Sequence, residues 1–123
     1  MQPTNALLAL RLPLAQQLAI GQTLPFRYRR DGFVEQGFVL RRSDGFVAFA
    51  NRCPHWNVDL DLGDERFYDP RVDRILCMNH GATFLPVDGT CDAGPCRGKQ
   101  LERFVVTSVG GSLIVQIPDA EPV

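Results

Sequence analysis

The stretch that decides the fold is residues 53–80, which read CPHWNVDLDLGDERFYDPRVDRILCMNH. It begins with Cys53-Pro54-His55 and ends with Cys77-Met78-Asn79-His80, with 21 residues between His55 and Cys77. Each Cys/His pair can hold one metal centre from a single turn, because thiolate is a soft donor and neutral imidazole a borderline one. His55 and His80 are the only histidines in the chain, and both stand at a short offset from a cysteine. We predict a metal site with the ligands Cys53, His55, Cys77 and His80.

Other metal centres use related ligands. Structural zinc also takes two Cys and two His, but zinc sites usually pair C-x₂₋₄-C with H-x₃₋₅-H, whereas each loop here mixes one cysteine with one histidine. A plant-type cluster uses four cysteines and includes a C-x₂-C pair, which this chain lacks. Zinc remains the alternative metal.

On both sides of this stretch, short apolar runs predict β-strands. The runs are Phe26–Arg29, Phe33–Val34, Phe38–Leu40, Phe46–Phe49, Phe104–Val106 and Leu113–Ile117. Asp31-Gly32, Ser43-Asp44-Gly45 and Gly110-Gly111 separate neighbouring runs, and such residues are typical of hairpin turns. No window after Ile20 shows a convincing helical period, so at most one short helix is expected, near Leu14–Ile20. The pattern predicts an all-β antiparallel sandwich or barrel.

Residues 51–99 have a different composition, rich in Cys, His, Pro, Gly and acidic residues with only short apolar runs. Loops with so little apolar content need another source of stability, and a bound metal centre supplies it. We therefore expect a single domain over residues 1–123. Its base would be residues 1–50 and 100–123, and residues 51–99 would form a metal-binding subdomain.

The order Cys53-x-His55 and Cys77-x-x-His80-Gly81 resembles the two cluster-binding loops of the Rieske family. Downstream, the family's sheet return, turn and third loop are matched by Phe84, Asp88-Gly89 and Gly94-Pro95. The resemblance runs from Asn51 to the C-terminus, with a weaker match of the strands before it. It implies a Rieske-type antiparallel β-sandwich or barrel with a small loop-rich cluster-binding subdomain.

The resemblance also implies a cofactor, one [2Fe-2S] cluster. Cys53 and Cys77 would bind one iron, and His55 and His80 the other. Two neutral imidazoles in place of two thiolates make the cluster less negative, so it accepts an electron more readily than an all-cysteine cluster. In the family the imidazole edges reach the surface and give the electron its route to a partner.

The chain departs from the high-potential members of the family. Those proteins carry an extra cysteine in each loop, joined as a disulfide, and Ser and Tyr hydroxyls that donate to cluster and ligand sulfurs. Val58, Asn79, Ala82 and Phe84 stand at these four places. Fewer hydrogen bonds to sulfur lower the reduction potential, toward the bottom of the range of about −150 to +300 mV. The resemblance is therefore to low-potential ferredoxins of ring-hydroxylating dioxygenases.

This resemblance implies a one-electron carrier between a flavoprotein reductase and a terminal oxygenase, and not an enzyme in its own right. An oxygenase needs a mononuclear iron on two further histidines, and both histidines here are already assigned. No G-x-G-x-x-G signature for a flavin or nicotinamide is present. The alternative is a cluster-bearing accessory or regulatory subunit, similar to the small subunit of nitrite reductase, or a redox sensor.

The composition of the chain limits the classes of partner it can bind and indicates its cellular compartment. A net charge of −1 and a pI near 6.1 give no basic excess for nucleic acid or an anionic membrane. Arg11 and Pro13 interrupt the Leu/Ala-rich N-terminal stretch, so we expect neither signal peptide nor membrane span. Four cysteines are too few for a disulfide-stapled secreted scaffold. We expect a cytoplasmic monomer whose partners are redox proteins.

Three further features of the sequence could serve function or could be purely structural. Trp56 either anchors a partner or only shields the metal centre. Cys91 and Cys96 are expected to be buried thiols without a ligand role, with a disulfide as the alternative. The charged residues are expected to be solvated rather than to steer a partner; they are Asp59, Asp61, Asp64, Glu65, Arg27, Arg29, Arg30, Arg41 and Arg42.

Overall fold

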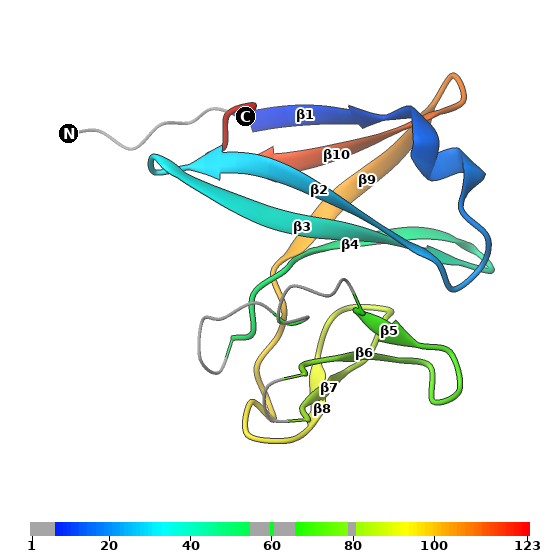
Figure 1. The fold of residues 1–123 in the computed structure, drawn as a ribbon, viewed down its shortest axis with the longest axis vertical. Coiled ribbons are helices and arrows are strands. Elements are labelled where there is room, and N and C mark those ends of the chain that lie inside the picture. Colours follow the sequence, from blue (N-terminus) through cyan, green and yellow to red (C-terminus); the bar gives the residue numbers. More distant parts are fainter. Residues whose placement is uncertain (1–6, 55–59, 61–65, 79–80) are drawn as a thin grey trace.

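Six antiparallel strands form the larger sheet of the computed structural model, which describes residues 7–54, 60, 66–78 and 81–123 apart from the side chain of Leu14. Their order is β1-β10-β9-β4-β3-β2. The bounds are β1 Leu7–Leu12, β2 Thr23–Arg30, β3 Phe33–Arg42, β4 Gly45–Ala50, β9 Arg103–Val109 and β10 Ser112–Pro118. The sheet curls, and two backbone hydrogen bonds of 2.9 and 2.8 Å between Arg29 and Glu121 join β2 to the segment after β10 (Figure 1). The predicted all-β antiparallel fold is confirmed.

The three predicted turns connect strands as expected. Asp31 and Gly32 have φ angles of 52° and 80°, and Gly110 and Gly111 have 54° and 82°. Two successive positive φ angles make the primed turn whose twist matches that of the flanking strands. The register confirms the pairs, since Arg30 faces Phe33 and Val109 faces Ser112. The turn between β3 and β4 lies between the paired residues Arg42 and Gly45.

The N-terminal segment is where the prediction needs correction. The structure places a strand, β1, before the short helix, and the helix itself is a 3₁₀ helix, η1, at Pro13–Gln17. A Leu- and Ala-rich composition does not favour a strand, and β1 forms because it pairs along its whole length with β10. Pro13 lacks a backbone donor and starts η1 at a position where none is needed.

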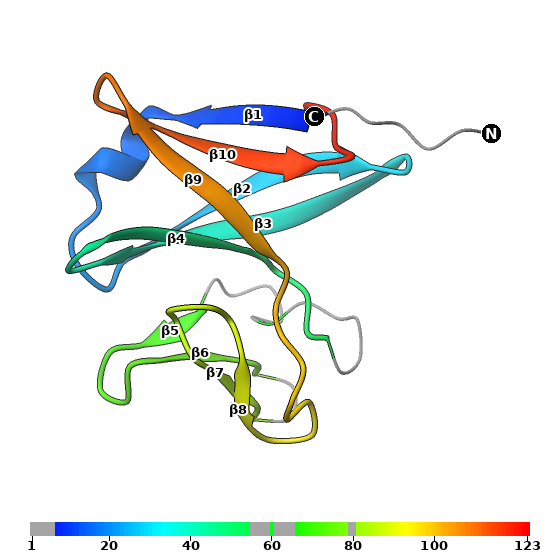
Figure 2. The same cartoon turned by 180° about the vertical axis from the view of Figure 1, so that it is seen from behind.

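A second, smaller sheet lies between β4 and β9 in the chain. Its antiparallel strands, in the order β5-β6-β7-β8, are β5 Tyr68–Asp69, β6 Arg74–Leu76, β7 Thr83–Phe84 and β8 Cys91–Ala93. β4 and β9 pair directly, with Ala48 opposite Phe104 and Phe49 opposite Arg103. The chain therefore leaves the larger sheet and returns to it at neighbouring points, as Figure 2 shows from behind.

β3 and β4 are buried on both faces over residues 37–40 and 47–50, which explains the continuous apolar runs there. One face joins the core inside the curled sheet, through Val39 and Ala48. The opposite face joins a second core, shared with the smaller sheet and its loops, through Phe38 and Phe49. Alternate side chains of a strand point to opposite faces, so one pair of strands supports both cores.

Candidate metal centre

The two predicted cysteine ligands lie at the ends of strands that face the second core. Cys53 comes shortly after β4, and Cys77 directly follows β6. Both side chains are 2% exposed and belong to the core between the two sheets. His55 and His80 lie outside the described residues, as do Trp56, Val58, Asn79 and the acidic residues 59, 61, 64 and 65. The structure therefore places half of the predicted ligand set.

Asn51 fixes the first loop, which we define as residues 51–60. Its side chain is buried at 3% exposure. Its amide nitrogen donates to Gln36 Oε1 at 2.7 Å, and its amide oxygen accepts from the backbone N–H of Leu60 at 2.8 Å. The two ends of the loop are thus tied together and to β3. Sequence reasoning missed Asn51, because a lone Asn after a strand is usually an ordinary turn residue.

The two ends of the second loop, residues 77–82, are joined by backbone hydrogen bonds. Cys77 N–H donates to Ala82 at 2.8 Å, and Gly81 N–H donates to Cys77 at 3.0 Å. Gly81 has a φ of 71°, a conformation that favours glycine. The backbone N–H of Met78 donates to the carbonyl of Leu60 at 2.7 Å. This bond joins the end of the first loop to the start of the second.

The chemistry around these cysteines fits a sulfur-ligated iron centre. Soft thiolates are the donors that iron–sulfur clusters use, and the neighbours Leu60, Ala82 and Phe84 are apolar and buried. Such a setting keeps water away from the sulfurs. Within residues 7–54, 60, 66–78 and 81–123, no three His, Cys, Asp or Glu side chains gather as another metal site.

Comparison with protein families agrees with this interpretation. The sequence model of the Rieske [2Fe-2S] domain matches residues 15–114. The chain belongs to the Rieske family. A Rieske domain binds one [2Fe-2S] cluster, so the chain is an iron–sulfur protein and the predicted family is confirmed.

Solved structures show the same fold. The ferredoxin of carbazole 1,9a-dioxygenase from Nocardioides aromaticivorans IC177 is 26% identical, with a TM-score of 0.64 over 87% of this chain and 95% of the ferredoxin. The terminal oxygenase of carbazole 1,9a-dioxygenase from Novosphingobium sp. KA1 is 21% identical, with a TM-score of 0.69 over 97% of this chain but only 31% of the oxygenase chain. A complex between oxygenase and ferredoxin of carbazole 1,9a-dioxygenase gives 20% identity and a TM-score of 0.68, over 96% of this chain and 30% of the other. No curated protein shows significant similarity.

The third loop of this Rieske domain, residues 91–99, packs directly on the second. A Cβ atom added at Gly94 would lie 2.7 Å from the Cα of Ala82, and Gly94 has a φ of 100°. Only glycine lets the two backbones approach this closely. Ala82 and Phe84, whose side chains carry no hydroxyl, are buried at 1% and 0% exposure.

Cys91 and Cys96 are buried thiols, as predicted. Cys96 Sγ donates to Cys91 Sγ at 2.7 Å, and Cys91 Sγ donates to the carbonyl of Ala93 at 3.2 Å. Burial raises the pKa of the Cys96 thiol, and the neighbouring Cys91 and Cys53 thiols add to the rise. This cysteine therefore stays protonated at neutral pH.

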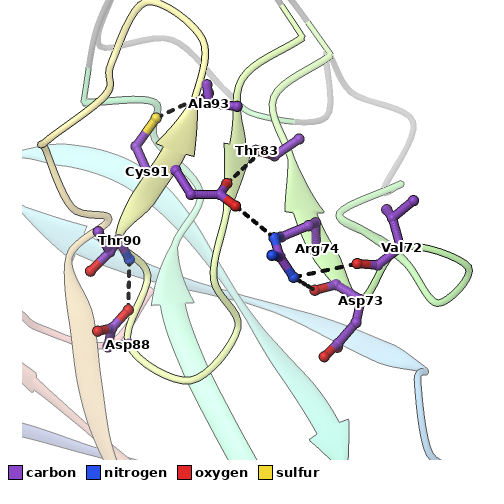
Figure 3. A network of polar contacts seen from close by, with 9 residues as sticks. Val72, Asp73, Arg74, Thr83, Asp88, Thr90, Cys91 and Ala93 are labelled. Atoms are coloured by element: carbon purple, nitrogen blue, oxygen red, sulfur yellow. Dashed lines mark hydrogen bonds and ion pairs between the residues drawn. The ribbon is translucent and has the colours of Figure 1, made fainter.

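A polar network joins three neighbouring strands of the smaller sheet, β6, β7 and β8 (Figure 3). Thr83 on β7 donates to Asp92 Oδ1 at 2.6 Å, and Arg74 Nε on β6 donates to Asp92 Oδ2 at 2.9 Å. The Thr83 hydroxyl, followed by the Arg74 guanidinium, lowers the pKa of Asp92. Because Arg74 precedes Cys77 by three positions and Thr83 follows Ala82, the network braces both ends of the second loop against β8.

Two of the basic residues on the larger sheet, Arg30 and Arg42, form ion pairs. Arg42 pairs with Asp73 at 3.1 Å, and Arg30 pairs with Glu102 at 2.9 Å. Arg30 also lines a pocket of about 440 Å³ beside Pro54, together with Arg27 and Arg52 and the carboxylates of Glu35 and Glu102. The two pairs join residues of β2 and β3 to the segment between β4 and β9.

Among the residues that the structure describes, no helix has the length and apolar content needed to cross a bilayer.

Proposed function

We propose that this chain is a Rieske ferredoxin that takes single electrons from a flavoprotein reductase and passes them to a terminal oxygenase. The observation that carries the proposal is the extent of the structural match. The chain covers 95% of the ferredoxin of carbazole 1,9a-dioxygenase but only about a third of the oxygenase chains. Among these structures, the one whose own length the chain matches almost completely is the carrier.

We further propose that the cluster ligands are Cys53 and Cys77 on one iron and His55 and His80 on the other. The buried cysteines on two hydrogen-bonded loops support this assignment. When bound, the [2Fe-2S] cluster supplies a site that accepts and releases one electron. The first and second loops hold the ligands in place, and the apolar residues around them exclude water.

The reduction potential is proposed to lie at the low end of the family range. Ala82 and Phe84 have no hydroxyl that donates to a sulfur, and the sulfurs therefore keep more electron density. A low potential suits a carrier that delivers electrons to an oxygenase. We place this carrier in the cytoplasm as a monomer, with residues 1–50 and 100–123 as its base and 51–99 as its cluster-binding subdomain.

The decisive measurement is an electron paramagnetic resonance spectrum of the dithionite-reduced protein, with its iron, sulfide and zinc content. Mixed Cys and His ligation gives a rhombic signal whose average g lies below that of all-cysteine clusters. Cys77→Ser should remove this signal, whereas Cys96→Ser, which changes a cysteine without a ligand role, should keep it. Zinc in the wild-type protein without a signal would refute the cluster and the carrier together.

A second experiment addresses the carrier role. The purified chain alone should be reduced by a flavoprotein reductase and NADH, with repeated turnover when a terminal oxygenase of the ring-hydroxylating class is added. The control omits this chain. A chain that holds its cluster only when bound to a large redox enzyme would instead be an accessory subunit, and the carrier proposal would fail.

A further inference from the structure

The proposed cluster site leaves two cysteines of the third loop without a role, Cys91 and Cys96. They are held close together by the loop backbone. Cys91 N–H donates to Lys99 at 2.8 Å, and Lys99 N–H donates to Cys96 at 2.9 Å. Gly98 N–H donates to the carbonyl of Cys91 at 3.4 Å. These bonds fold the segment back on itself, so that both side chains point into the same part of the core.

The two sulfur atoms are already near bonding distance. Their separation is 2.7 Å, whereas a disulfide bond measures about 2.05 Å. A shift of well under 1 Å, roughly the difference between these two lengths, would bring them together. Both residues are buried, at 2% and 0% exposure, so oxidation is slow and needs a reagent small enough to reach them.

We propose that Cys91 and Cys96 are a dithiol that peroxide converts to a disulfide within the third loop. The two S–H bonds break and one S–S bond forms, so the pair loses two electrons and two protons. Hydrogen peroxide accepts them, its O–O bond breaks, and two water molecules leave. A thiol reductant reverses the change by exchange through a mixed disulfide.

The test follows the disulfide directly and does not depend on activity. Trypsin releases residues 75–97 as one peptide, which holds Cys77, Cys91 and Cys96, while Cys53 lies in the separate peptide 53–66. The cluster-loaded protein is treated with stoichiometric hydrogen peroxide while its visible absorbance is followed. Before the absorbance falls, the protein is denatured, alkylated and digested, and the peptide masses are measured by mass spectrometry.

The expected product is peptide 75–97 with one alkyl group, on Cys77, and two hydrogen atoms fewer than the fully reduced peptide. Dithiothreitol should restore three alkylation sites. Cys91→Ser and Cys96→Ser should each abolish the disulfide and leave two alkylated cysteines in this peptide. The same disulfide should form in protein that binds no cluster, which separates this inference from the proposed function.

Two results would overturn the inference. One is a peptide that carries three alkyl groups after peroxide treatment. The other is a link between peptides 53–66 and 75–97, which would mean that Cys53 is the true partner.

Discussion

Replacing Gly94 by alanine should separate the third loop from the second. The added Cβ would stand 2.7 Å from the Cα and 2.9 Å from the Cβ of Ala82, with a φ of 100° at its own residue. The contact is with backbone and with a short side chain, so neither neighbour can turn away. The loop must move, and the packing against Ala82 must open.

Two physical effects set the size of the loss, and Gly98 offers a matched control. Gly98 lies in the same loop with a φ of 89°, but an added Cβ meets nothing within 4 Å. Alanine in a left-handed conformation costs about 1–2 kcal/mol, and this applies to both positions. Overpacking adds about 1–3 kcal/mol at Gly94 alone. We expect about 2–5 kcal/mol for Gly94→Ala and about 1–2 kcal/mol for Gly98→Ala.

The assay is thermal unfolding, followed by circular dichroism and by the visible absorbance of the cluster at one fixed scan rate. A fixed rate is needed because cluster loss makes unfolding irreversible. At roughly 4 °C per kcal/mol for a chain of this size, Gly94→Ala should lower the apparent melting temperature by about 8–20 °C and Gly98→Ala by about 4–8 °C. Equal losses for the two variants would show that the contact with Ala82 contributes nothing, and the reasoning would be refuted.

Three other variants test the aromatic packing between the two sheets, the polar network around Asp92 and the exposed side chain next to Cys77. Phe67 stacks on Phe38 at 4.3 Å between ring centroids, so Phe67→Ala should cost about 3–5 kcal/mol in thermal unfolding; a loss below that of Gly98→Ala would contradict this. Asp92→Asn should lower the melting temperature more at pH 7 than at pH 3, because a lowered carboxyl pKa stabilises the fold above its usual value of 3.8 and this contribution decreases as the pH falls toward the folded pKa; a gap independent of pH would count against the ion pair. Met78 beside Cys77 is 40% exposed, and partial burial of its side chain by a partner is worth about 1 kcal/mol, so Met78→Ala should weaken partner binding about fivefold in titration calorimetry with an unchanged potential. An altered potential would instead assign Met78 to the cluster environment.

The sequence predicted the strands whose apolar runs are bounded by turn residues. Asp31-Gly32 and Gly110-Gly111 encode their own conformation, because their φ angles decide the turn before any tertiary contact forms. The strand at Leu7–Leu12 was missed because it depends on pairing with β10, which is more than 100 residues away in sequence. Local composition carries no information about such a partner.

The site was predictable in its ligand types and less so in its supports. Cys53 and Cys77 stand out because cysteine beside histidine at short spacing is rare and has a chemical purpose. Asn51, Asp92 and Thr83 form ordinary polar contacts whose value lies in where the fold places them. No spacing rule marks them in advance.

The sharing of β3 and β4 by two cores affects what happens when the cluster is lost. Without iron, the segment between β4 and β9 loses a main source of its order, while the hydrogen bonds between β4 and β9 still close the larger sheet. A chain in that state would expose a strip of Phe38, Leu40, Val47 and Phe49 on an otherwise folded sheet. An apolar strip of this kind favours self-association and recognition by chaperones and proteases. The strands that hold the cluster-binding subdomain in place are therefore also the surface that cluster loss would uncover.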